Sequence, residues 1–134
     1  MLMLNFEGVV TSGLKKAGIF MQKDTYQKQY QEKLGFIPYN GTLNVKLKND
    51  FEINIKEKYK DKLRIIEGDE NLGDVYFLDA TITTKNKKIS KKGAILFPIK
   101  TVHKIDTIEF VSPEKIRQSM HVKDNSEVII KITD

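Results

Sequence analysis

The amino-acid sequence predicts a mainly β fold, a small closed or nearly closed β-barrel with one or two short helices at its ends. Short apolar runs recur at intervals of about 8–20 residues, and turn residues separate them. No series of long helices alternates with these runs, which argues against a doubly wound parallel sheet. The chain has 134 residues, so we expect one domain over 1–134 that buries a core without disulfides or a structural metal.

The strands are predicted from alternating polarity. The pattern is clearest in 74–83 and 105–111, where every second residue is apolar. Pro98 indicates that the strand over 93–99 ends there or lies at an edge. Further strands are expected at 3–11, about 42–48 and 128–133, with short ones at 51–55 and 63–67.

Two helices are expected. The longer one covers 24–35, where Asp24 or Thr25 can cap the start and Gly35 can end it. Its apolar face consists of Tyr26, Tyr30 and Leu34. The shorter helix covers 112–120, with Ser112 at the cap position and a proline in the first turn.

Composition and charge limit the possible chemistry. There are no cysteines, which excludes disulfides, thiolate zinc sites, iron–sulfur clusters and a cysteine nucleophile. The start of the chain does not read as a signal peptide and no apolar run is long enough to cross a membrane, so we expect a cytoplasmic protein. The net charge is +5, but only Arg64 and Arg117 among the 23 basic residues are arginines. Lysine provides point charge for phosphate rather than bidentate base reading.

Two short motifs are candidates for binding phosphate and metal. In "TSGLKKAG" (11–18), glycines allow the backbone to approach phosphate and lysines add charge. It matches neither the P-loop nor the dinucleotide fingerprint, and an ordinary turn is the alternative. In "PYNGTLNV" (38–45), strand alternation places Thr42 and Asn44 on one face. Their neutral oxygens suit a magnesium ion that already carries phosphate, and a solvent-facing strand is the alternative.

A third stretch, 98–117, concentrates polar residues that can act on a substrate. His103 can serve as an acid or base, or it can be an ordinary surface histidine. Glu109 lies opposite Ile108 and Phe110 by alternation, so it either faces solvent or lines the mouth of the barrel. No strong general base is evident.

Taken together and in this order, the motifs resemble the archaeal CTP-dependent riboflavin kinase family. The resemblance is most specific in "LGF-PY-GTLNV-L" and extends over nearly the whole catalytic domain, whereas 49–92 match only in strand character. The matching segments are "VVTSGLKKAGIFM" (9–21), "YQEKLGFIPYNGTLNVKL" (30–47), "PIKTVHKIDTIEFVSPEKIRQSMHVKD" (98–124) and "EVIIKI" (127–132).

The resemblance implies a six-stranded cradle-loop β-barrel and transfer of the CTP γ-phosphate to the 5′-hydroxyl of riboflavin, giving FMN and CDP. Thr42 and Asn44 match the family's Mg²⁺ ligands, and Thr101 and Glu109 match positions that contact the flavin. The nucleotide-binding residues that it implies are Gly13, Leu14, Lys15, Lys16, Ala17 and Gly18 in the loop, and Glu114, Lys115, Ile116 and Arg117 in "EKIR".

The loop departs from the family pattern, which is usually a denser glycine run near G-x-G-x-G/A. Lys15 and Ala17 replace expected glycines, and Gly18 stands where a larger residue is common. Lys15 therefore either follows an ordinary backbone path or contacts a phosphate directly. Many relatives carry an N-terminal helix-turn-helix domain, and we expect none here.

The expected partners are CTP or CDP and riboflavin or FMN, with Mg²⁺ as cofactor, and neither nucleic acid nor a membrane. A monomer is favoured. Two other hypotheses remain. A basic nucleic-acid-binding β-barrel would follow from the charge of +5, although arginine and surface aromatic residues are scarce. A flavin-binding protein without catalytic activity would follow from the altered loop.

Overall fold

A computed structural model describes residues 5–12, 24–39, 42–48, 61–68, 74–86, 88–98 and 107–132. Within these ranges lie seven strands and two helices. In chain order they are β1 (Asn5–Thr11), α1 (Asp24–Leu34), β2 (Leu43–Leu47), β3 (Arg64–Ile66), β4 (Val75–Thr84), β5 (Ser90–Pro98), β6 (Thr107–Val111), α3 (Ile116–Ser119) and β7 (Glu127–Ile132).

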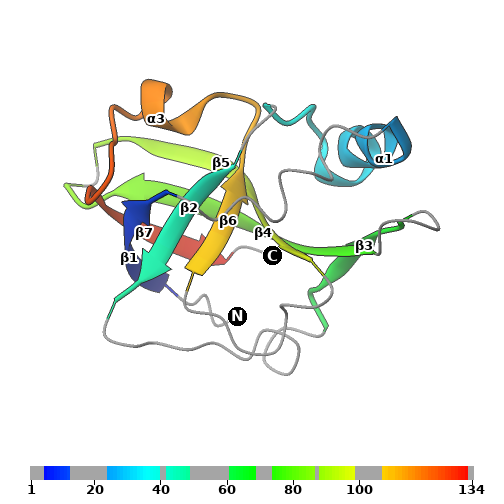
Figure 1. Ribbon diagram of the computed structural model, residues 1–134, viewed down its shortest axis with the longest axis horizontal. Helices are drawn as coiled ribbons and strands as arrows, with labels where there is room; N and C mark the ends of the chain where they lie inside the picture. The colour runs from blue at the N-terminus through cyan, green and yellow to red at the C-terminus, as the bar shows by residue number, and fades with distance from the viewer. Residues whose placement is uncertain are drawn as a thin grey trace.

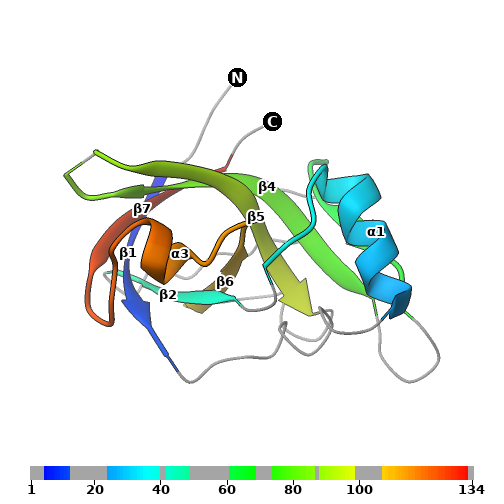
Figure 2. The same ribbon diagram turned by 90° about the horizontal axis from the view of Figure 1, so that it is seen from above.

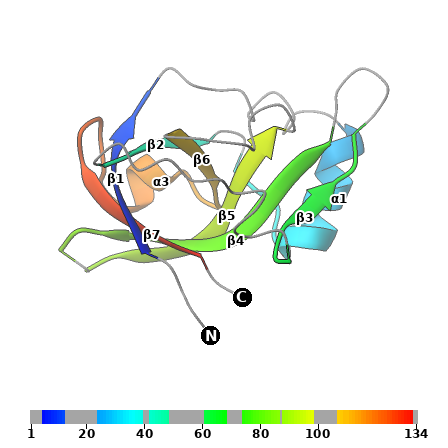
Figure 3. The ribbon, with the colours of Figure 1, turned by 90° about the horizontal axis from the view of Figure 1, so that it is seen from below.

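Six of the strands form a closed antiparallel ring (Figure 1). The strand order is β4-β5-β6-β2-β1-β7, and β4 also pairs with β7, which closes the ring. The short strand β3 pairs with the other part of β4, outside the ring (Figure 3). The predicted mainly β fold with two short helices is confirmed.

The interior of the ring holds the main hydrophobic core. Alternate residues of β2 point inward, so Leu43, Val45 and Leu47 are at most 4% exposed. The short helix α3 lies over one end of the ring (Figures 1 and 2), where Ile116 and Met120 join the same core. The residues between the inward-facing ones therefore form the outer surface of the ring.

A second hydrophobic cluster covers part of that outer surface. Helix α1 packs Tyr30 and Leu34 against Ile66, Val75 and Phe77 of β3 and β4. Figure 2 shows α1 to one side of the ring and α3 well separated from it. The predicted apolar face of α1 is confirmed for Tyr30 and Leu34, and Gly35 with a φ of 81° ends the helix.

Two elements differ from the sequence prediction. Strand β5 begins at Ser90 rather than at residue 93, because Ser90 and Lys92 pair in register with Thr83 and Thr81 of the neighbouring strand. Helix α3 covers only Ile116–Ser119, so the prediction that Ser112 caps a helix is wrong.

The Ser112 side chain instead forms a local turn. Its Oγ accepts a hydrogen bond from the Glu114 backbone N–H at 3.0 Å, and its own carbonyl accepts one from Tyr39 N–H at 2.7 Å. The tertiary contact with residue 39 holds 112 at the end of β6. The predicted strand at 51–55 lies outside the described residues. Among the described helices, none combines the length and apolarity that a membrane crossing requires.

Candidate functional site

Three of the candidate side chains meet on the outer face of the ring. Asn44 of β2 pairs in register with Glu109 of β6, and Thr42 immediately precedes β2. The neighbours of Asn44 along β2 point into the core, so Asn44 and Glu109 project from the opposite face. This arrangement agrees with the predicted pairing of Thr42 and Asn44 on one face. The same arrangement means that the Glu109 side chain does not point into the interior of the ring.

Asn44 has a buried oxygen without a partner. The residue is 4% exposed, and its Oδ1 accepts no hydrogen bond within the described part of the chain. A buried carbonyl oxygen normally has a partner, because leaving it unsatisfied costs about 1–3 kcal/mol. An unsatisfied amide oxygen of this kind is a suitable ligand for a hard cation.

Thr42 and Glu109 are joined by a hydrogen bond. The Thr42 hydroxyl donates to Glu109 Oε1 at 2.9 Å, although 67 residues separate them in sequence. Glu109 is only 2% exposed, and a buried carboxyl group requires such donors. Because the hydroxyl proton is directed to the carboxyl group, the lone pairs of Thr42 Oγ1 remain available to a cation.

The end of β1 connects this cluster to the "EKIR" segment. Thr11 pairs in register with Asn44, and its backbone carbonyl accepts a hydrogen bond from Arg117 Nη2 at 3.2 Å. Two residues after Thr11 the chain enters the Gly13–Gly18 loop. The fold thus brings Asn44, Arg117 and the end of β1 to one place, although they are far apart in the sequence.

The residues of "EKIR" lie in different environments. Glu114 is exposed and pairs with Lys91 Nζ at 3.0 Å, and this ammonium group holds the pKa of Glu114 below its ordinary value. Lys115 is exposed at the start of α3. Ile116 is 5% exposed and packs in the core, so only its backbone can face a nucleotide. Arg117 is half-buried and pairs with Asp124 at 2.7 Å.

Several predicted positions lie outside the described residues. They are the loop residues Gly13 to Gly18, the flavin candidate Thr101 and the possible acid or base His103. Conversely, sequence reasoning did not single out Asp124 or Ser12, which bond to each other across 112 residues of chain. No local pattern in the sequence marks such a contact.

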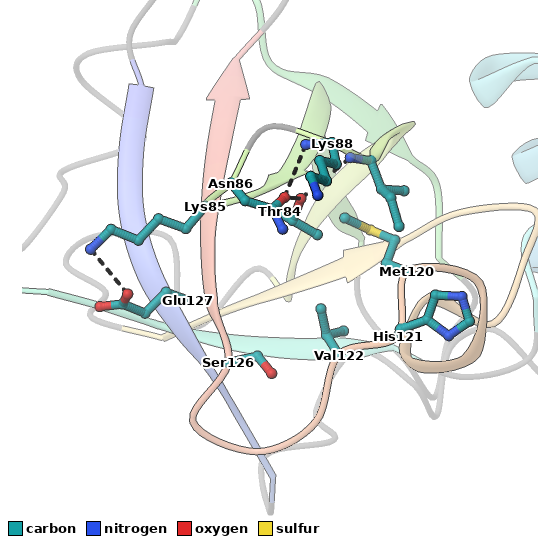
Figure 4. Close-up of a pocket in the computed structure, with 10 residues that line it drawn as sticks. Thr84, Lys85, Asn86, Lys88, Met120, His121, Val122, Ser126 and Glu127 are labelled. Atoms are coloured by element: carbon teal, nitrogen blue, oxygen red, sulfur yellow. Dashed lines mark hydrogen bonds and ion pairs between the residues drawn. The ribbon is translucent and has the colours of Figure 1, made fainter.

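A surface pocket of about 590 Å³ lies elsewhere, between the β4–β5 turn and the segment that follows α3 (Figure 4). Ile89, Met120 and Val122 contribute apolar surface to it. Its polar rim holds the turn together, because Asn86 Oδ1 accepts from Thr84 Oγ1 at 2.6 Å and from Lys88 N–H at 3.0 Å. Thr42, Asn44, Glu109 and the "EKIR" residues do not line this pocket.

Comparison with known proteins gives a consistent result. The family model CTP-dep_RFKase, described as "Domain of unknown function DUF120", matches residues 10–132. A riboflavin kinase of Methanosphaera stadtmanae is 57% identical over 130 residues, covering 97% of this chain and 98% of the relative. A riboflavin kinase of Methanobrevibacter smithii is 33% identical over 128 residues, covering 96% and 99%. One of Pyrobaculum islandicum is 35% identical over 133 residues, covering 98% of this chain and 61% of the relative. The chain therefore belongs to the CTP-dependent riboflavin kinase family.

Proposed function

We propose that this protein transfers the γ-phosphate of CTP to the 5′-hydroxyl of riboflavin, giving FMN and CDP. The observation that carries the proposal is the buried Oδ1 of Asn44, which has no partner among the described residues, beside the Thr42–Glu109 hydrogen bond. Family membership supports the reaction class, and the pairing of Asn44 with Thr11, two residues before Gly13 in the sequence, supports the use of this cluster in phosphoryl transfer.

The donor set fits magnesium. Asn44 offers an amide oxygen and Thr42 a hydroxyl oxygen, both hard and neutral. Neutral ligands are sufficient because the triphosphate itself supplies negative charge. When bound there, Mg²⁺ would neutralise charge on the phosphate oxygens. Thr42 and Asn44 would hold it, and Glu109 orients the Thr42 hydroxyl through the bond of 2.9 Å.

The other residues bind and orient the substrates. Backbone N–H groups of the Gly13–Gly18 loop, with Lys15 and Lys16, donate to the phosphates, and Arg117 adds a guanidinium beside the end of β1. Glu109 and Thr101 contact the flavin. The riboflavin hydroxyl oxygen attacks the γ-phosphorus in line, and the bond from phosphorus to the β,γ-bridging oxygen breaks. A loose transition state needs positioning and charge neutralisation more than a strong base.

The test is FMN formation. Purified protein is mixed with riboflavin, Mg²⁺ and each of the four nucleoside triphosphates, and FMN is measured by chromatography. We expect FMN with CTP. If CTP gives no FMN, and the protein binds neither flavin nor CDP, the proposal is wrong. Binding of flavin without FMN formation would instead support the non-catalytic alternative.

Two variants test the metal ligands. Thr42→Ala and Asn44→Ala should each lower the rate at least about tenfold while the protein remains folded. Thr83→Ala is a matched control, because Thr83 also lies on a strand and bonds through its hydroxyl, to Ser90 at 2.7 Å. Full activity in both Thr42→Ala and Asn44→Ala would reject the metal assignment.

A further inference from the structure

The turn between α3 and β7 is attached to the end of β1. Asn125 N–H donates to the Val10 carbonyl at 2.8 Å, and Val10 N–H donates to the Ser126 carbonyl at 2.8 Å. These two backbone bonds fix the turn beside the last residues of β1. The chain continues from there through Ser12 into the Gly13–Gly18 loop.

Asp124, in this turn, joins two segments with one carboxylate. Its Oδ1 accepts from Arg117 Nη2 at 2.7 Å, and its Oδ2 accepts from Ser12 Oγ at 2.9 Å. The hydrogen bond from Arg117, and then the one from Ser12, holds the pKa of Asp124 below its ordinary value. The group is therefore a carboxylate at neutral pH and accepts both bonds at once.

We propose that Asp124 is a positioning residue for the nucleotide: it holds the Arg117 guanidinium at the end of β1 and fixes Ser12, the residue directly before the Gly13–Gly18 loop. This inference rests on the proposed function. It adds a residue that neither contacts the metal candidates nor belongs to "EKIR".

The geometry leaves Arg117 able to bind an anion. Its contacts with Asp124 and with the Thr11 carbonyl both use Nη2, whereas a guanidinium carries five N–H donors. Among the described residues, none bonds to Nε or Nη1 of Arg117. Those donors suit a phosphate oxygen. Without Asp124, the Arg117 side chain would become ordered only when the nucleotide binds. That ordering costs free energy, so the affinity of the protein for the nucleotide would fall.

The experiment compares Asp124→Asn and Ser12→Ala with the wild-type protein. Asp79→Asn is the matched control, because Asp79 also pairs with an arginine, Arg64, at 3.3 Å and is also partly exposed. The KM for CTP, the KM for riboflavin, kcat, CDP binding by calorimetry and the thermal midpoint are measured for each protein.

We expect the KM for CTP and the Kd for CDP to rise about tenfold in Asp124→Asn and about threefold in Ser12→Ala. The KM for riboflavin should stay within about twofold, because neither residue lies in the Thr42–Glu109 cluster. Asp79→Asn should change none of these constants.

Three results would overturn the inference. If the wild type is active but the KM for CTP and the Kd for CDP change by less than about twofold in both variants, the positioning role of Asp124 is wrong and the proposed function still stands. Equal changes for CTP and riboflavin in Ser12→Ala would indicate a general structural role instead. A wild-type protein that neither binds CDP nor forms FMN would overturn the proposed function, and with it the positioning role. If Asp124→Asn does not fold, Ser12→Ala decides, because it removes one exposed hydrogen bond.

Discussion

Replacing Asn44 with leucine should separate stability from ligand binding. Leucine has the same branched shape, so Asn44→Leu removes the buried Oδ1, which no described residue satisfies, and fills its place with an apolar group. Relief of an unsatisfied buried carbonyl is worth about 1–3 kcal/mol. For a chain of 134 residues, each kcal/mol shifts the thermal midpoint by about 3–5 °C. Without ligands, the variant should therefore melt about 3–15 °C above the wild type.

The response to ligand should change in the opposite direction. At a concentration of Mg²⁺ and CDP about a hundred times the dissociation constant, binding stabilises a protein by about 2.7 kcal/mol. The wild-type midpoint should rise by roughly 8–13 °C under these conditions. In Asn44→Leu this rise should be largely lost. Thermal unfolding is followed by circular dichroism, with and without the ligands.

The neighbouring residue provides the matched control. Val45 is fully buried and faces the core, so Val45→Ala should cost about 2–3 kcal/mol and leave the ligand-induced rise intact. The two substitutions, one residue apart, should thus have opposite effects. If Asn44→Leu melts several degrees below the wild type and still responds fully to Mg²⁺ and CDP, the assignment of Asn44 as a ligand is refuted.

Three further predictions follow from other contacts. Thr42→Ser should keep activity within about threefold, whereas Thr42→Val should lower activity at least about tenfold. Thr42→Val should also destabilise the protein by about 1–3 kcal/mol, because buried Glu109 loses a hydrogen-bond donor. Equal activity in the two variants would contradict this prediction. Gly93→Ala should lower the free energy of unfolding, measured by chemical denaturation, by about 3 kcal/mol or more, since a Cβ would lie 2.7 Å from the Phe110 ring and against the Val111 carbonyl. Gly35→Asn adds a side chain where no atom lies within reach, so it should change the free energy of unfolding by less than about 1 kcal/mol. Hydrogen bonds from Lys48 and Lys85 lower the pKa of Glu127, so the ionised Glu127 stabilises the fold above its ordinary pKa of about 4.3, and this stabilisation disappears as the pH falls through the lowered pKa. The difference in unfolding free energy between the wild type and Glu127→Gln should therefore be largest near neutral pH and vanish in acid. A difference that does not depend on pH would refute this prediction.

Local patterns predicted most of the strands. Alternation placed β4, β6 and β7 within a few residues, because one face of each packs into the core. The short helix exists, but its predicted start at 112 was wrong for a tertiary reason: the Ser112 carbonyl is bonded to Tyr39, a residue 73 positions earlier in the chain. Ser90 and Lys92 carry no apolar signal, and only pairing with β4 makes them part of a strand.

The candidate site was only partly predictable. Alternation alone predicts that Thr42 and Asn44 share a face, and the resemblance supplies their role. The register between β2 and β6, which sets Glu109 beside Asn44, is not encoded locally. The same holds for Asp124, which meets Ser12 and Arg117 only after the ring has closed.

Ring closure has a kinetic consequence. Strand β7 pairs with β1 on one side and with β4 on the other, and its partner Asn5 lies more than a hundred residues before Lys131. Adjacent hairpins such as β4–β5 can form early, but the circle is completed only by this distant pairing. Refolding should therefore be slow for a chain of this length, and the end of β1 that leads into the proposed nucleotide-binding loop should acquire its native arrangement in the last step.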